Sequence, residues 1–291
     1  MRICSIDVGT NTVVSLVADV EDGVLRVLAD EERFARLGQG VDASGRLADE
    51  AMDRVVDRLA QAQATADRLG AERTVIAATS ASRDASNVGD LQARVRDELG
   101  LDYRVISGVD EAALSFRGAL AMRPALDGAC VVDIGGGSTE IVAGTRNDGV
   151  RVRASLDVGS VRLTERHVAA YPLTDDAVAG VVGDVRAALA GVDRGAVEGV
   201  PVVATGSVAR WLAGADEAAS LAEVAAWRDR IVALAPAEVL ALAPDRLAGR
   251  EDVVAASVLI LHAVLEGLGA DRYLATRGAL RHGLALQAAA A

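Results

Sequence analysis

Short apolar runs alternate along this chain with longer segments in which apolar residues recur every three or four positions. The short runs predict strands, and the longer segments predict helices. Two pairs of strands flank glycine-containing turns, at residues 2–8 and 12–20 and again at 130–132 and 141–143. We therefore expect an α/β protein. Further strands are expected at 24–28, 74–78, 103–106, 150–156, 200–204 and 272–275, and helices at 47–69, 108–122, 174–189, 220–234, 236–242 and 250–268.

The two turn regions resemble each other position by position. Residues 4–12 and 130–138 both place a cysteine three residues before an aspartate, which is followed by an aliphatic residue and a glycine. An internal repeat of this kind predicts two similarly folded halves. We expect domains at 1–122 and 123–291, with the last helix packing back on the first domain as an option. The two loops would then face each other across a cleft.

The second turn has the chemistry of a phosphate site. Consecutive glycines, Gly135, Gly136 and Gly137, let the backbone bring several N–H groups to one point, and such a concavity binds anions. Asp133 and Glu140 flank the loop with two carboxylates, a suitable seat for Mg²⁺ that also bridges phosphate oxygens. The turn therefore indicates phosphate chemistry.

Other segments add candidates of lower specificity. Strand, glycine turn and helix start meet at Gly206 and Ser207, which predicts a further anion site. Arg83 can hold a phosphate or be an ordinary surface arginine. Asp110 fits the role of a capping residue in a first helical turn. Glu111, in the same turn, can be a second capping residue or a general base.

Composition narrows the class of protein. The chain has 291 residues and a formal net charge of −12, and arginine supplies every basic residue other than histidine. The acidic balance argues against general nucleic-acid binding. No apolar run approaches the length of a membrane span. Because the first apolar stretch carries Asp7 and Asn11 and lacks a basic start, we expect no signal peptide and a cytoplasmic location. Cys4 and Cys130 fit buried apolar positions.

Taken together, these stretches resemble the exopolyphosphatase and guanosine pentaphosphate phosphatase family. The resemblance covers nearly the whole chain and implies two actin-like (ribonuclease H-like) domains of the actin/Hsp70/sugar-kinase superfamily, with an interdomain cleft. The motifs that carry it are residues 7–11, 78–83, 106–112, 133–140, 156–165 and 204–206.

The resemblance also implies roles for individual residues. Glu111 would activate water, and Asp133 and Glu140, with Asp7, would hold Mg²⁺, with Mn²⁺ as an alternative. A homodimer is expected from the family. The residues expected to bind substrate phosphate are Thr10, Asn11, Arg83, Gly135, Gly136, Gly137, Ser138, Gly206 and Ser207.

The sequence departs from the family pattern at a few positions. Ala113 stands where arginine is usual, Ser207 and Val208 replace glycine and threonine, and His282 replaces an acidic residue. These changes concern outer phosphate contacts. The chain also ends where longer members continue, so we expect distributive action that favours short chains.

Several functions fit these features. The leading hypothesis is Mg²⁺-dependent removal of terminal phosphate from inorganic polyphosphate, and the second is 5′-phosphate hydrolysis of guanosine pentaphosphate (pppGpp). Only seven aromatic residues are present, which favours polyphosphate over a nucleobase. A non-catalytic polyphosphate or nucleotide sensor would not need Glu111, and a kinase would need a hydroxyl-bearing acceptor. Phosphate release without an acceptor separates these classes.

Overall fold

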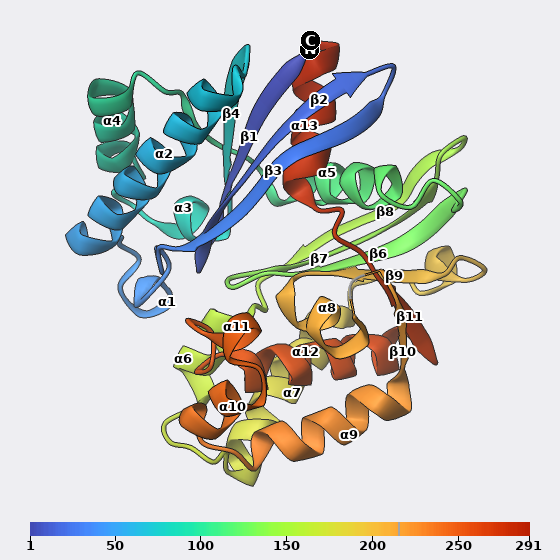
Figure 1. Cartoon of the computed structure of the whole chain (residues 1–291). Coiled ribbons are helices and arrows are strands. Elements are labelled where there is room, and N and C mark those ends of the chain that lie inside the picture. Colours follow the sequence, from blue (N-terminus) through green and yellow to red (C-terminus); the bar gives the residue numbers. More distant parts are fainter. Residues whose placement is uncertain (215) are drawn as a thin grey trace. The chain divides into compact units, whose positions relative to one another are not determined.

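The computed structural model describes residues 1–214 and 216–291, which form two compact units (Figure 1). Unit 1 contains residues 1–124 and 278–291, and unit 2 contains residues 125–277. The chain therefore leaves unit 1 near Pro124 and returns to it at Gly278. The sequence-based division ended the first domain at residue 122 and assigned 123–291 to the second. In the structure, the returning helix belongs to unit 1.

Unit 1 is a five-stranded sheet with helices on both faces. Its elements are β1 (Arg2–Val8), β2 (Thr12–Glu21), β3 (Val24–Phe34), α1 (Val41–Ser44), α2 (Asp49–Leu69), β4 (Arg73–Ala78), α3 (Ser80–Asp84), α4 (Val88–Leu99), β5 (Tyr103–Val105), α5 (Gly108–Ala121) and α13 (Leu280–Ala290).

Unit 2 has a six-stranded sheet and a larger set of helices. Its elements are β6 (Gly128–Ile134), β7 (Thr139–Thr145), β8 (Gly149–Leu156), α6 (Ser160–His167), α7 (Asp175–Leu189), the 3₁₀ turn η1 (Gly195–Val197), β9 (Val202–Thr205), α8 (Ser207–Ala213), β10 (Ala218–Ser220), α9 (Leu221–Val232), α10 (Pro236–Leu242), α11 (Pro244–Leu247), α12 (Val254–Leu268) and β11 (Arg272–Ala275).

The two sheets repeat one topology. Unit 1 has the order β3-β2-β1-β4-β5, and unit 2 has β8-β7-β6-β9-β11 with β10 added at the far edge. In each, the first three strands of the unit pair antiparallel, and the first, fourth and fifth strands of the repeat pair parallel. The predicted internal repeat and α/β fold class are therefore confirmed.

Alternation along β1 sorts its side chains between two helical layers. Cys4 and Ile6 belong to the core formed with α2 and α4, whereas Ile3 packs with residues of α13. Ser5 lies on the same face as Ile3, and its hydroxyl donates to the Arg281 carbonyl of α13 at 2.7 Å. Because side chains two apart share a face of a strand, Asp7 also lies on the face that α13 and α5 cover.

Glycines allow α13 to approach α5 closely. A Cβ on Gly118 would overlap the carbonyl oxygen of Ala279, and one on Gly283 would overlap that of Leu114. Arg281 is buried and forms a bidentate ion pair with Asp30 of β3, at 2.7 and 2.8 Å. The returning helix is thus fixed to both the sheet and α5.

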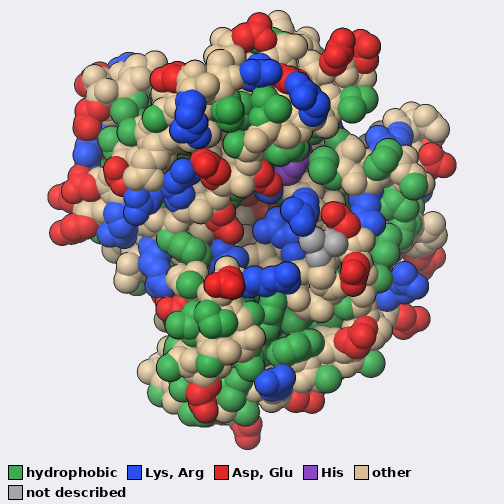
Figure 2. Space-filling model, viewed as in Figure 1, with side chains coloured by type: hydrophobic (Ala, Val, Ile, Leu, Met, Phe, Trp, Pro, Cys, Tyr) green, Lys and Arg blue, Asp and Glu red, His purple; other side chains and the backbone are tan. Residues whose placement is uncertain are grey.

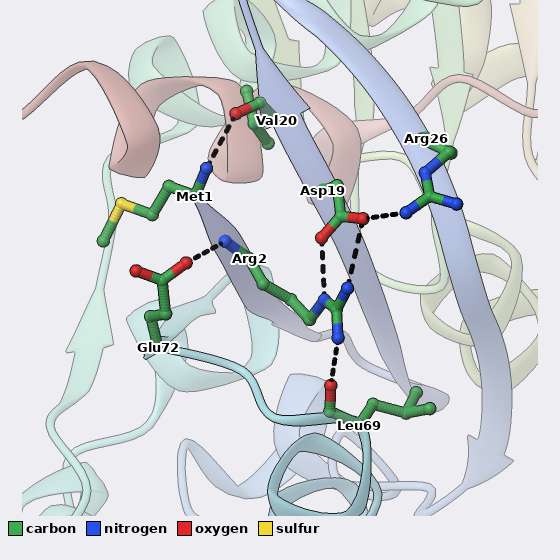
Figure 3. Close-up of polar contacts among 7 residues, drawn as sticks. All are labelled: Met1, Arg2, Asp19, Val20, Arg26, Leu69 and Glu72. Carbon is green, nitrogen blue, oxygen red and sulfur yellow. Dashed lines mark hydrogen bonds and ion pairs between the residues drawn. The ribbon is translucent and has the colours of Figure 1, made fainter.

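A polar network ties the outer end of the same sheet together (Figure 3). The Arg2 guanidinium donates to Asp19 of β2 at 2.7 Å and to the Leu69 carbonyl at the end of α2 at 2.6 Å. Asp19 also pairs with Arg26 of β3. These hydrogen bonds hold the pKa of Asp19 down at about 2.

Most predicted elements are confirmed, and the differences lie at the ends of elements and at the edges of the sheets. β3 continues to Phe34 through the charged residues 30–33, because an edge strand exposes side chains that a buried strand would exclude. The helix expected from 250 begins at Val254, and β10, three residues long, had no sequence signal.

The charged side chains of both signs are mixed on the face shown in Figure 2, with hydrophobic side chains scattered between them. The acidic excess therefore does not form one continuous patch on that face. In the described part of the chain, every helix falls short of the length or hydropathy that crossing a bilayer requires.

Candidate functional site

The first candidate turn joins β1 to β2 in unit 1. The Gly9 N–H donates to the Thr12 carbonyl at 2.9 Å, which closes the turn. The carbonyls of Thr10 and Asn11 accept hydrogen bonds from backbone N–H groups of residues 35–38, the segment that follows β3. Thr10 is buried and Asn11 is half-buried. The polar side chains of Thr10 and Asn11 therefore lie on a turn whose backbone is fixed by hydrogen bonds from the segment after β3.

Glu111 and Arg83 are brought together in the same unit. Glu111 is 8 % exposed in the first turn of α5, and Arg83 lies in the last turn of α3. The Arg83 Nη1 atom lies 2.6 Å from Glu111 Oε2 and 3.2 Å from the carbonyl oxygen of Ile106. Arg83 and Glu111 are 28 residues apart in the sequence, and their ion pair fixes the Glu111 carboxylate in one orientation. Arg83 is thus neither an isolated surface arginine nor a group that acts apart from Glu111.

Asp110 has the capping role expected for it. The Asp110 N–H donates to the Ser107 hydroxyl at 3.1 Å, and that hydroxyl donates to Asp110 Oδ2 at 2.7 Å. Glu111 is directed instead toward Arg83. Adjacent carboxylates therefore have different partners.

The second candidate turn, between β6 and β7 of unit 2, repeats the first. The Gly135 N–H donates to the Ser138 carbonyl at 2.9 Å, the equivalent of the Gly9 to Thr12 bond. Behind it, α6 begins without a side-chain cap, and its first backbone N–H groups donate to the Gly135 and Gly136 carbonyls at 2.8–3.1 Å. The start of α6 thus takes its missing hydrogen-bond acceptors from the glycine turn.

The N–H groups of this turn are the predicted anion site. Among the described residues, no hydrogen bond acceptor is seen for the backbone N–H of Gly136, Gly137 or Ser138. Successive backbone N–H groups that converge in a turn bind anions. The turn therefore keeps three donors available for a ligand.

Asp133 and Glu140 stand beside that turn. They are directly opposite each other in the antiparallel β6–β7 ladder, so their side chains leave the same face of the sheet. Glu140 is 1 % exposed, and its Oε1 accepts a hydrogen bond from Ser155 at 2.8 Å. Asp7, the third predicted metal ligand, belongs to unit 1, where Val14 is its cross-strand partner. In the described residues, no group of three or more His, Cys, Asp or Glu side chains is arranged to hold a metal.

Gly206 and Ser207 follow β9 in unit 2. Gly206 has φ of +97°, a conformation that favours glycine, and a Cβ there would lie 2.9 Å from the Ile134 carbonyl oxygen. Thr205 pairs with Asp133 across the parallel β6–β9 ladder, and its fully buried Oγ1 has no hydrogen-bond partner among the described residues. This strand end therefore lies beside the carboxylate at Asp133.

Sequence reasoning gave no role to Gly159 or Arg162, although it included both in the motif at 156–165. Arg162 Nε donates to the Gly137 carbonyl at 2.7 Å. A Cβ on Gly159 would lie 2.5 Å from the carbonyl carbon of Gly136. The one sequence signal for this contact is Gly159 at the start of the helix, where a capping side chain would be usual. Arg162 and Gly159 contact backbone atoms of the glycine turn, and the residue types in a sequence do not reveal such contacts.

The chain as a whole is similar to known proteins. The family model of the Ppx/GppA phosphatase family matches residues 16–290. Exopolyphosphatase 2 of Mycobacterium tuberculosis is 44 % identical over 183 residues, which cover 60 % of this chain and 57 % of the relative. The guanosine-5′-triphosphate,3′-diphosphate pyrophosphatase of Vibrio cholerae is 36 % identical over 172 residues, covering 58 % of this chain and 34 % of the relative.

A solved structure extends the likeness to nearly the whole chain. The crystal structure of an exopolyphosphatase from Cytophaga hutchinsonii superposes with a TM-score of 0.88 and 26 % identity, covering 97 % of this chain and 96 % of that one. The matched part spans just over half of the mycobacterial relative and about a third of the Vibrio one. With the family model matching from residue 16 to residue 290, the chain belongs to the Ppx/GppA phosphatase family.

Proposed function

We propose that this chain hydrolyses phosphoanhydride bonds and removes terminal phosphate from inorganic polyphosphate. The observation that carries the proposal is the turn at 135–138. The backbone N–H groups of residues 136–138 have no acceptor among the described residues, and they lie beside the Asp133–Glu140 pair. The N–H groups can bind phosphate oxygens, and the two carboxylates can bind a metal ion that the same phosphate also coordinates. Relatives named exopolyphosphatase support the substrate class.

Glu111 is the proposed general base. A carboxylate needs to be ionised and oriented to accept a proton from water, and the Arg83 contact at 2.6 Å supplies the orientation. The hydrogen bonds seen for Arg83 use only Nη1, and a guanidinium has five N–H donors. Arg83 can therefore bind a phosphate oxygen while it keeps Glu111 in place. Thr10 and Asn11 are the proposed side-chain contacts of the first turn.

Mg²⁺ fits the donor set of unit 2. This ion keeps several waters and is bound through one or two carboxylates plus substrate phosphates, so the pair Asp133 and Glu140 suffices without a third protein ligand. When bound, such a metal neutralises charge on the phosphate oxygens. Asp7 remains a proposed further ligand, and Mn²⁺ is the alternative metal. Gly206 and Ser207 remain proposed phosphate contacts, and a homodimer and a cytoplasmic location remain predictions.

The second candidate substrate is pppGpp, which the Vibrio relative's name favours. The aromatic residues near the motifs weigh against it. Trp211 packs on Trp227 with ring centroids 4.9 Å apart, and Phe116 is buried. Phe116 is therefore not presented for stacking on a guanine, and Trp211 already has Trp227 as a neighbouring ring. Polyphosphate, which has no base, needs only the phosphate contacts.

The deciding experiment measures phosphate release from purified tripolyphosphate and, in parallel, from pppGpp, with Mg²⁺ and no acceptor. We expect release from both, with the larger kcat/KM for tripolyphosphate. A larger kcat/KM for pppGpp would reverse the substrate assignment. Binding of tripolyphosphate without any phosphate release would instead identify a sensor, and release only with a hydroxyl-bearing acceptor would identify a kinase.

A further inference from the structure

Four donors from the start of α6 converge on the carbonyl groups of the glycine turn. The Ser160 N–H donates to Gly135 O at 3.0 Å, and the N–H groups of Val161 and Arg162 donate to Gly136 O at 2.8 and 3.1 Å. The Arg162 Nε donates to Gly137 O at 2.7 Å. Three consecutive peptide groups therefore each accept a hydrogen bond on the carbonyl side.

The consequence for the amide side follows from peptide geometry. In a planar trans peptide, the C=O of one residue and the N–H of the next point in opposite directions. Binding the carbonyls of residues 135–137 to α6 therefore directs the N–H groups of residues 136–138 away from α6. These are the same three N–H groups that have no acceptor among the described residues. Hydrogen bonds in series also polarise one another, so each N–H becomes a stronger donor.

Arg162 differs from the other donors because it carries a full charge. A guanidinium bound to a carbonyl forms a charge-assisted hydrogen bond, which is about twice as strong as a neutral one. The peptide that it polarises contains the Gly137 carbonyl and the Ser138 N–H. Close packing supports the contact, since Gly159 has no room for a Cβ against residues 136 and 137.

We propose that Arg162 is a positioning residue for phosphate binding: it fixes and polarises the peptide that presents the Ser138 N–H to the substrate. This inference rests on the proposed function of the glycine turn, and it adds a charge that acts through the backbone without touching substrate. It also explains why a helix start without a capping side chain follows β8. Its N–H groups already have acceptors in the turn.

The first test needs no substrate. The Gly137 carbonyl carbon and the Ser138 amide are observed by NMR in the wild type and in Arg162→Met, which keeps an unbranched stem and removes the charge. We expect both resonances to shift, and those of the Gly9 to Thr12 turn to stay in place. Arg166→Met is the matched control, because Arg166 lies on the same helix and pairs with Asp184. Unchanged Gly137 and Ser138 resonances in Arg162→Met would overturn the proposal.

The second test measures binding and turnover. Titration with inorganic phosphate should show about tenfold weaker binding for Arg162→Met, the scale of a lost charged hydrogen bond. The KM for tripolyphosphate should rise with it, whereas a variant that is merely less well folded would lose kcat at constant KM. Arg162→Lys should recover part of the loss. Because the chain contains no other lysine, its ammonium group gives a single resonance that reports contact with the turn.

The two proposals fail in different ways. If the wild type releases no phosphate from tripolyphosphate or pppGpp, the proposed function is wrong, and the NMR and phosphate titrations still judge Arg162. If Arg162→Met binds phosphate and hydrolyses tripolyphosphate like the wild type, the positioning role is wrong while the hydrolase proposal stands.

Discussion

The turn between β1 and β2 can be compared residue by residue with the turn between β6 and β7. Each is closed by a glycine N–H that donates to the carbonyl three residues later, at 2.9 Å in both units. In each, the segment after the unit's third strand supplies N–H groups to the turn carbonyls, from residues 35–38 in unit 1 and 160–162 in unit 2. The backbone design has been kept in both copies.

The side chains are where the copies differ. Thr10 and Asn11 occupy the positions that Gly136 and Gly137 occupy in unit 2. The turn of unit 1 therefore carries polar side chains, and unit 1 also contains the Glu111–Arg83 ion pair. Unit 2 offers bare N–H groups and a pair of opposed carboxylates. The same turn fold therefore carries polar side chains in one copy and exposes backbone N–H groups in the other.

The largest expected effect tests the side-chain half. Glu111→Gln keeps the shape and loses the base, so turnover of tripolyphosphate should fall by about 10²–10⁴ while substrate binding persists. Asp110→Asn is the control, because Asp110 only caps α5. Turnover near that of the wild type in Glu111→Gln would remove Glu111 from the mechanism.

The next effect concerns metal binding and distinguishes Asp133 from Asp7, the aspartate at the equivalent position of the repeat. Asp133 faces Glu140 across its ladder, whereas Asp7 faces Val14. Asp133→Asn should therefore raise the Mg²⁺ concentration needed for half-maximal activity several-fold, and more than Asp7→Asn does. Activity is measured against Mg²⁺ after treatment with chelator. An equal or larger rise for Asp7→Asn would show that the carboxylate pair is not the main metal ligand.

A smaller effect tests the segments behind the turns. The atoms nearest to a Cβ at Gly159 would be turn backbone, at 2.4–2.5 Å, whereas those nearest to a Cβ at Gly38 would be side-chain atoms of Thr10, at 2.1 and 3.2 Å, and of Ala81, at 3.3 Å. Gly159→Ala should therefore lower the free energy of unfolding by about 1–3 kcal/mol, the usual cost of overpacking, and Gly38→Ala by less. Urea unfolding measures both. The reverse order would mean that the glycine turn adjusts more easily than Thr10.

The smallest effect is a difference in acid response between the units. Burial and then Arg228 lower the pKa of His262 in unit 2, so the unfolded chain binds the proton more tightly than the folded one. The stability from neutral His262 is complete above its ordinary pKa of 6.5 and is lost as pH falls toward the lowered value. Arg186 also opposes its protonation, whereas Glu266 and Asp229 favour it.

In unit 1, the lowered pKa of Asp19 also makes stability fall on acidification, but in a lower pH range. Its stabilising contribution persists above the ordinary pKa of 3.8 and is lost as pH falls toward about 2. Unit 2 should therefore weaken first on acidification. Both tryptophans, Trp211 and Trp227, lie in unit 2, so their fluorescence during thermal unfolding at pH 5 and pH 7 reports that unit. His262→Gln should reduce the difference between the two pH values, and an unchanged difference would contradict the assignment.

Much of the fold was predictable because its signals are local. The repeat at residues 4–12 and 130–138 was visible from a cysteine, an aspartate and a glycine in register, and the sheets confirm it. The Glu111–Arg83 pair was not visible, since the two residues come from different helices. Arg162 was missed because its partner is a carbonyl group, which every residue possesses. The direction of a backbone carbonyl is set by the fold, so contacts with it cannot be inferred from residue types alone.

The return of the chain to unit 1 has a consequence for biosynthesis. Unit 2 is continuous from 125 to 277, so it can complete its folding as soon as it leaves the ribosome. Unit 1 cannot, because Ile3, Leu16 and Val20 are covered by Ala285, Leu286 and Ala288 of α13. Until those residues emerge, the apolar face of the β1–β2 part of the sheet, which is synthesised before them, stays exposed to solvent. This sheet face is thus synthesised before the whole of unit 2 and yet buried only after unit 2 is complete.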